Sequence, residues 1–259
     1  MSIRKTEAVV LKGWKMGETS KILSLYTRDF GKIRAVAKGA RGLRSKFKGC
    51  LEPLTHIGIV YYDKRTRDLQ LLSSAYLIDP HLGIIGDIKR TTLGLAAAEL
   101  VERAVAGEEP HTRLFDLLTY TLGFLGKTSG FLEGVFWFFE SHFINLMGYK
   151  PRWSMCLMCG KSLGIGGAYF QPQNGGLLCS ECGRGGGGLV VESETLEILY
   201  WLQKDDINDV EKLDPTPAQK SEIRKMFDIY FKTHIEHMRS LKSLALYYEL
   251  ENGDKEPRR

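Results

Sequence analysis

Four of the five cysteines in the sequence form two pairs with the same internal spacing. Cys156 and Cys159 make the first pair, Cys179 and Cys182 the second, in a C-x2-C-x19-C-x2-C pattern. Two intervening residues let a tight turn aim both sulfurs at one ion, so two such turns supply the four thiolates of a tetrahedral zinc site. Four cysteine ligands leave no open coordination position. The pattern therefore predicts one structural Zn²⁺ ion rather than a catalytic one.

Two disulfides or four free thiols are the alternative interpretations of these pairs. The first eight residues carry charges where a secretory peptide has its apolar segment, so we expect no export signal and a cytoplasmic location. Disulfides are rare in that compartment, which favours zinc. We expect Cys50, far from both pairs, to be a buried apolar residue. No apolar run reaches the length that spans a bilayer, so we expect no membrane association.

The basic residues are concentrated at one end of the chain. Residues 1–50 hold 13 lysines and arginines and three acids, in a chain of 259 residues with net charge +5. Within 32–48, cations alternate with glycines that let the backbone approach phosphates. Aromatic residues of the same region offer stacking surfaces for bases; they are Trp14, Tyr26, Phe47, Tyr61 and Tyr62. This combination is typical of single-stranded nucleic-acid binding. A solvated basic loop beside buried aromatics is the structural alternative.

The basic segment lies in a region with the pattern of short strands. Runs rich in β-branched, aliphatic and aromatic residues predict five strands, at 6–11, 21–26, 32–37, 56–62 and 69–78. The longest connection follows the third strand, as in a barrel of the oligonucleotide-binding (OB) type. An SH3-like barrel is the alternative that the pattern leaves open.

After residue 80 the pattern becomes helical and the cysteines lie in an insert. Apolar residues at three- and four-residue spacing predict helices at 88–106, 112–125, 131–147, 194–202 and 217–250. Within the insert, Asn174-Gly175 is a hairpin turn signal between the cysteine pairs, which is typical of a zinc ribbon. We predict an α+β multidomain protein: a five-stranded OB-fold β-barrel over 1–80, and an all-α domain over 81–259 carrying a zinc module at about 152–188.

No catalytic arrangement is evident in the sequence. Gly126-Lys127-Thr128 lacks the preceding glycine and strand of a phosphate-binding loop. His234 and His237 lack a third metal ligand, so we expect them to be surface residues. The three acids of the first 50 residues are too few for the magnesium site of a nuclease. We therefore predict that the protein is not an enzyme.

The sequence resembles the RecO family of bacterial recombination mediators over nearly its whole length. The resemblance rests on GETSKILSLYTRDFGK, VAKGARGLRSKF and LEPL near the start, then on YLID, the four cysteines and the terminal RSLKSL. It implies an OB fold, a helical domain with zinc, and a role in the RecF pathway at the nucleoid. It also implies binding of single- and double-stranded DNA, annealing of complementary strands, and recognition of the C-terminal tail of single-stranded DNA-binding protein. With RecR, such proteins help RecA to load onto strands coated by that protein.

Carried over by position, the resemblance assigns DNA contacts to basic residues of the predicted barrel. The candidates are Arg34, Lys38, Arg41, Arg44, Lys46 and Lys48, with Lys12, Lys15 and Lys21 as weaker ones. The main alternative function is that of a zinc-ribbon, OB-fold RNA-binding or translation accessory protein, since RNA would meet the same cations and aromatics.

Overall fold

A computed structural model describes residues 2–64, 66–107, 109–164, 166–186, 188–204, 206–210, 212–236 and 238–253. The chain divides into two compact units, which are described separately. Unit 1 comprises residues 1–127 and 241–259, and unit 2 comprises residues 128–240. The predicted domain boundary at residue 80 falls inside unit 1 and stays a prediction. His237 lies outside the described residues.

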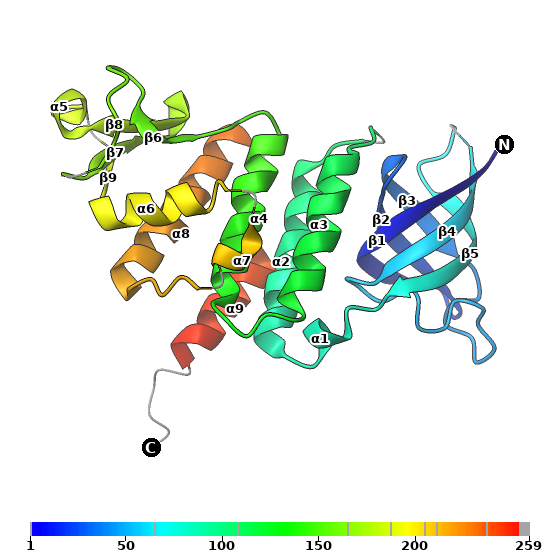
Figure 1. Ribbon diagram of the computed structural model, residues 1–259. Coiled ribbons are helices and arrows are strands. Elements are labelled where there is room, and N and C mark those ends of the chain that lie inside the picture. The colour runs from blue at the N-terminus through cyan, green and yellow to red at the C-terminus, as the bar shows by residue number, and fades with distance from the viewer. Residues whose placement is uncertain are drawn as a thin grey trace. The chain divides into compact units, whose positions relative to one another are not determined.

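Unit 1 begins with a closed five-stranded barrel (Figure 1). Its strands are β1 (Ser2–Met16), β2 (Ser20–Thr27), β3 (Gly31–Ala37), β4 (His56–Asp63) and β5 (Gln70–Asp79). Their order is β1-β2-β3-β5-β4, with β1 also pairing with β4. All pairs are antiparallel except β3 and β5. This is the topology of the OB fold, as predicted.

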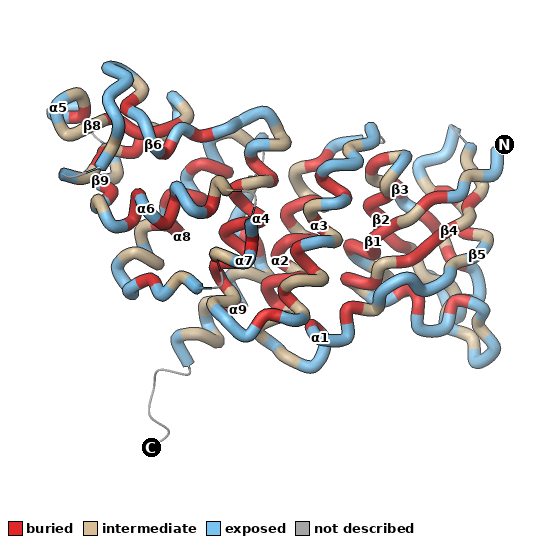
Figure 2. Tube along the Cα trace, in the orientation of Figure 1, coloured by how far each residue is buried: buried red, intermediate tan, exposed pale blue. Residues whose placement is uncertain are grey.

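The barrel core consists of inward-facing aliphatic residues. Alternation along the strands places Ala8, Leu23, Ile33, Ile57 and similar side chains inside. The connection from β3 to β4 adds its own apolar residues, and Phe47, Cys50 and Leu51 belong to the same cluster. Cys50 is thus buried, as predicted. Figure 2 shows buried stretches along the strands and exposed stretches along the connections.

The helices of unit 1, within its described residues, are α1 (Leu82–Ile85), α2 (Ile88–Ala104), α3 (Thr112–Leu125) and α9 (Lys242–Gly253). The Asp87 carboxylate caps α2 by accepting from the backbone N–H groups of Lys89 and Arg90. The Glu99 carboxylate of α2 accepts hydrogen bonds from the N–H groups of Lys242 and Ser243, at 3.1 and 3.0 Å. This contact places the first turn of α9 against α2.

Part of the outer barrel face is bound to α2. Ser24 Oγ donates to the Glu102 carboxylate at 2.5 Å, and Lys32 Nζ donates to the Glu102 carbonyl at 2.5 Å. Burial lowers the pKa of Lys32. Lys32 therefore binds α2, although it belongs to the basic segment of the sequence.

Unit 2 combines helices with a small sheet. The helices are α4 (Leu132–Leu146), α5 (Ser180–Gly183), α6 (Ser193–Trp201), α7 (Ile207–Val210) and α8 (Pro217–His234). The strands are β6 (Arg152–Cys156), β7 (Ala168–Gln171), β8 (Gly176–Cys179) and β9 (Leu189–Val191), in the order β6-β8-β7-β9, with the 3-10 helix η1 (Pro172–Asn174) between β7 and β8. None of the helices in the described ranges is long and apolar enough to cross a membrane.

The single helix expected over 217–250 is two helices. The chain leaves α8 at Ile235, whose backbone is extended, with φ −107° and ψ 115°. The next helix, α9, begins at Lys242 and belongs to unit 1. Between these two helices the chain passes from unit 2 to unit 1. Local periodicity does not encode this passage.

Candidate metal centre and nucleic-acid interface

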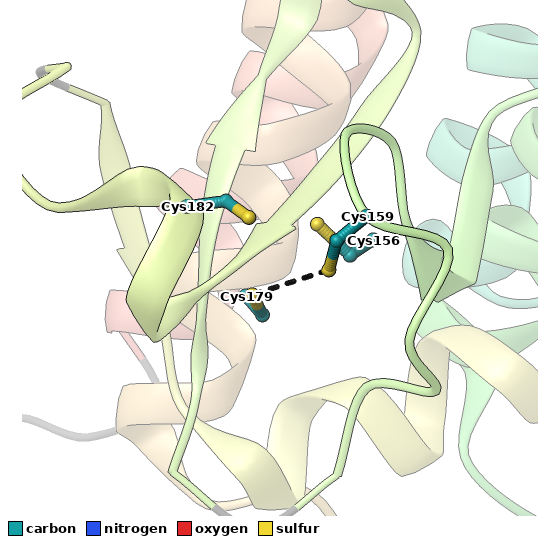
Figure 3. A group of neighbouring side chains, drawn as sticks. All are labelled: Cys156, Cys159, Cys179 and Cys182. Carbon is teal, nitrogen blue, oxygen red and sulfur yellow. Dashed lines mark hydrogen bonds between the residues drawn. The ribbon is translucent and has the colours of Figure 1, made fainter.

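The structure brings the four paired cysteines together in unit 2 (Figure 3). Cys156 ends β6 and Cys159 lies in the turn that follows, while Cys179 ends β8 and Cys182 lies in α5. Their Sγ atoms all lie within 4.8 Å of one another, and Cys159 and Cys179 are 3.8 Å apart. Four sulfurs about 2.3 Å from one tetrahedral zinc ion would be about 3.8 Å apart. The cluster therefore has the dimensions of a metal site.

The first cysteine turn favours a thiolate. The Gly160 N–H donates to the Cys156 carbonyl at 3.0 Å, and Gly160 has φ +71°, which favours glycine. Burial opposes ionisation of the Cys156 thiol, but hydrogen bonds from the backbone of Cys159 and Cys179 outweigh it and lower its pKa to about 6, while hydrogen bonds with Cys179 and Cys159 raise the pKa of the Cys182 thiol to about 12. The thiolate is the form that binds metal.

The glycine after the second pair has a packing role. Gly183 is buried, and a Cβ atom there would lie 2.3 Å from the Tyr169 ring. The two glycines thus differ in role: Gly160 has the positive φ that its turn requires, whereas Gly183 lets an aromatic ring approach.

An aromatic cluster joins the cysteine module to α8. The rings of Trp153, Phe170 and Tyr230 lie 5.7 to 6.1 Å from one another. His234 Nε2 lies 2.7 Å from the Pro172 carbonyl oxygen, a hydrogen-bond distance. His234 is half-buried rather than a surface residue, and no sequence motif signals this contact with a turn 62 residues away.

The predicted DNA contacts lie in two parts of the barrel. Four belong to strands: Lys12 and Lys15 in β1, Lys21 in β2 and Arg34 in β3. The others lie in the connection from β3 to β4, here called the basic loop (residues 38–55); they are Lys38, Arg41, Arg44, Lys46 and Lys48. All nine are exposed except Lys21, which is half-buried.

A cavity of about 440 Å³ lies between the β1–β2 hairpin and the basic loop. Its cationic lining consists of Lys15, Lys21, Arg41 and Lys48. Glu52 is the acid among the lining residues. Cations from three segments of the sequence thus converge on one concave surface that suits a phosphate.

Two of these cations also hold the basic loop in place. Lys21 Nζ donates to the Leu51 carbonyl at 2.6 Å and lies 3.2 Å from the Glu52 carboxylate. Arg41 donates from its backbone N–H to the Thr19 carbonyl at 2.8 Å and from Nη1 to the Gly17 carbonyl at 3.1 Å. The loop is therefore fixed against the β1–β2 turn. Lys21 has a structural role in holding it there.

The aromatics of the barrel separate into two groups. Tyr26, Phe47 and Tyr61 are at most 2% exposed and belong to the interior. Trp14 and Tyr62 are half-buried and retain accessible surface. Three of the five candidates for base stacking are therefore buried aromatics, as the alternative interpretation of the sequence expects.

Comparison with known proteins gives the family. Residues 1–81 match the family described as recombination protein O N terminal, and residues 85–245 match recombination protein O C terminal. The chain belongs to the recombination protein O family. This membership confirms the resemblance found in the sequence and supports a role in DNA recombination and repair.

Similar proteins come from several bacteria. A "DNA repair protein RecO" of Chloroherpeton thalassium is 29% identical over 256 residues, which cover 96% of this chain and 99% of the relative. Another of Streptomyces coelicolor is 31% identical, covering 94% and 98% of the two chains. A third of an Anaeromyxobacter species is 35% identical, covering 69% and 70%. The likeness to the first two extends over both units.

Proposed function

We propose that the protein is a DNA-binding recombination mediator that holds single- and double-stranded DNA and anneals complementary strands. The observation that carries this proposal is the convergence of Lys15, Arg41 and Lys48 on one cavity of the barrel. Family membership supplies the biological setting. Phosphates bound there would release counterions, so the affinity depends strongly on salt.

Annealing follows from charge neutralisation. Two strands repel each other through their phosphates, and a surface that neutralises both lowers the barrier to pairing. Among the described residues, Lys38, Arg44 and Lys48 have no acidic partner in an ion pair, so their charge is available to DNA. The protein neutralises the phosphates, and the bases of the two strands then pair with each other.

In the cell this activity would assist the loading of RecA onto DNA. We propose that the protein acts in the RecF pathway at the nucleoid, binds the C-terminal tail of single-stranded DNA-binding protein, and with RecR helps RecA to load onto coated strands. Family membership supports these partners. In this proposal the protein performs no catalytic step.

The cysteine cluster would hold one structural Zn²⁺ ion. Its four sulfurs have the spacing of a tetrahedral site, and thiolates are ligands that zinc favours. The ion would join the turn after β6 to the end of β8 and to α5, and so stabilise the module that packs on α8.

A strand-annealing assay tests the proposal. We expect the protein to accelerate pairing of complementary oligonucleotides, both uncoated and coated with the cognate single-stranded DNA-binding protein, with RecR joining the coated complex. The triple variant Arg41→Ala, Arg44→Ala, Lys46→Ala should lose most of this acceleration. A charge-matched control carries Lys212→Ala, Lys225→Ala and Lys232→Ala in unit 2. Failure of the wild-type protein on uncoated strands would contradict the proposal.

A further inference from the structure

A row of half-buried apolar side chains crosses the outer face of the barrel. Trp14 is paired with Ile22, Ile22 with Val36, Val36 with Leu71, and Leu71 with Tyr62. Directly paired residues of neighbouring strands point to the same face of a sheet. All five are neither fully buried nor fully exposed. The row thus forms a partly accessible apolar band with an aromatic residue at each end.

A β-bulge determines that Trp14 faces outward. The register of β1 against β2 shifts between Val10 and Lys12. Beyond the shift, Gly13 pairs with the core residue Leu23, and Trp14 takes the opposite face. A Cβ atom on Gly13 would lie 2.6 Å from Lys21 Cε, which shows how closely the inner side is filled.

Two cations lie over the indole ring of Trp14. Lys12 Nζ is 5.0 Å and the Arg34 guanidinium carbon 5.8 Å from its ring centroid. Both residues are exposed, and neither has an ion-pair partner within the part of the chain that the structure describes. In contrast, Lys32 on the same strand as Arg34 is bound to Glu102. The cations at Trp14 are therefore available to an external anion.

The other end of the band also carries cations. Tyr62 lies two residues before Lys64, and the connection from β4 to β5 then adds Arg67. Both cations are exposed. An apolar band with aromatic ends and cations beside them matches the chemistry of single-stranded nucleic acid, whose bases stack while its phosphates need counter-charges.

We propose that Trp14 is the platform on which a base of single-stranded DNA stacks. Lys12 and Arg34 move from the ring to the phosphates on either side of that base, and the strand crosses Ile22 and Val36 towards Tyr62. This inference rests on the proposed function and deepens it, because it adds a base-contacting surface to the phosphate-binding cavity of the basic loop.

The binding of oligo(dT) to Trp14→Ala, Trp14→Phe and wild-type protein tests the proposal. Loss of one base-stacking contact should weaken binding by about 5- to 150-fold in Trp14→Ala. Trp14→Phe should retain most of the affinity because it keeps a stacking ring. The salt slope of binding should stay unchanged, since no phosphate contact is removed. Trp201→Phe, which removes an exposed tryptophan of unit 2, is the matched control and should bind like wild type.

An abasic strand of the same length separates stacking from a scaffold role. Trp14→Ala and wild-type protein should bind this strand equally, because it offers phosphates without bases. In the Trp201→Phe background, Trp14 is the tryptophan with accessible surface, since Trp137 and Trp153 are at most 2% exposed. Its fluorescence should be quenched by oligo(dT) and not by the abasic strand.

Two results would overturn the inference alone. One is equal affinity of Trp14→Ala and wild type for oligo(dT); the other is an equal loss of affinity for both kinds of strand, which would make Trp14 a scaffold residue. In either case, binding that still depends on Arg41, Arg44 and Lys46 would leave the proposed function standing. Absence of DNA binding by wild-type protein would overturn both.

Discussion

Two buried acids of α4 differ in how their charge is balanced. The Glu133 carboxylate accepts two hydrogen bonds from the Arg224 guanidinium, each at 2.6 Å. Burial raises the pKa of Glu140 well above its usual range, and the negative charges of Glu133 and Asp228 raise it further. The sequence shows both acids only as interruptions of an apolar helix. The partner of Glu133 could not be predicted, because Arg224 lies in α8, 91 residues further along the chain.

Replacing Glu140 by glutamine should change the pH dependence of stability. Below the ordinary glutamate pKa, Glu140 is protonated in folded and unfolded chains alike and has no effect. As pH rises towards the raised folded pKa, only the unfolded chain releases the proton, so the free energy of unfolding falls by about 1.4 kcal/mol per pH unit. Glu140→Gln should abolish this fall and stabilise the protein at neutral pH.

Urea unfolding between pH 4 and 8 measures this effect. Glu197→Gln on the exposed side of α6 is the control and should follow the wild-type curve. Parallel pH profiles for wild type and Glu140→Gln would contradict the account of Glu140.

At the scale of elements, the sequence predicted most of the structure because the strands and helices have clear periodicities. The five strands of the barrel were found, as were the cysteine turns, whose ligand spacing is set locally. The end of α8 was missed, since residues 235–241 contain helix-forming types and the extended backbone at Ile235 depends on where the chain must go next. Likewise, burial of Phe47 in the barrel follows from the closure of the basic loop rather than from its own sequence.

Replacing one cysteine of the cluster should remove the metal and loosen the module. We expect Cys159→Ser to lower bound zinc from one ion per chain to nearly none, because a structural site needs all four ligands. The module should then unfold at lower temperature than in wild type. Metal analysis and thermal unfolding measure both effects. Cys50→Ser, in the barrel core, is the matched control and should keep the full zinc content; a normal zinc content in Cys159→Ser would contradict the assignment of its ligands.

At the scale of the whole molecule, the chain returns at its end to the unit in which it began. α9 follows unit 2 in sequence but belongs to unit 1, where Glu99 binds the first N–H groups of the helix. Composition and periodicity describe neighbours in sequence, so they could not predict this return. The charge distribution, in contrast, could be read directly, because residues 1–50 are basic as a group.

Removing the Glu99 carboxylate should loosen α9. Glu99→Ala leaves the N–H groups of Lys242 and Ser243 without their acceptor, at a cost of about 0.5–2 kcal/mol typical of a lost helix cap. We expect faster hydrogen exchange over residues 242–253, measured by mass spectrometry. Glu197→Ala serves as the control, and unchanged exchange in Glu99→Ala would show that α9 is held by other contacts.

The salt dependence of single-stranded DNA binding tests most directly whether the basic loop binds DNA. For wild-type protein and the variant Arg41→Ala, Arg44→Ala, Lys46→Ala, the logarithm of the binding constant is measured against the logarithm of salt concentration. We expect the variant to bind more weakly and its slope to be shallower by about 2, since each phosphate contact contributes about 0.7. The charge-matched variant of Lys212, Lys225 and Lys232 should keep the wild-type slope. Equal affinity and equal slope for wild type and the basic-loop variant would contradict the assignment of DNA binding to this surface.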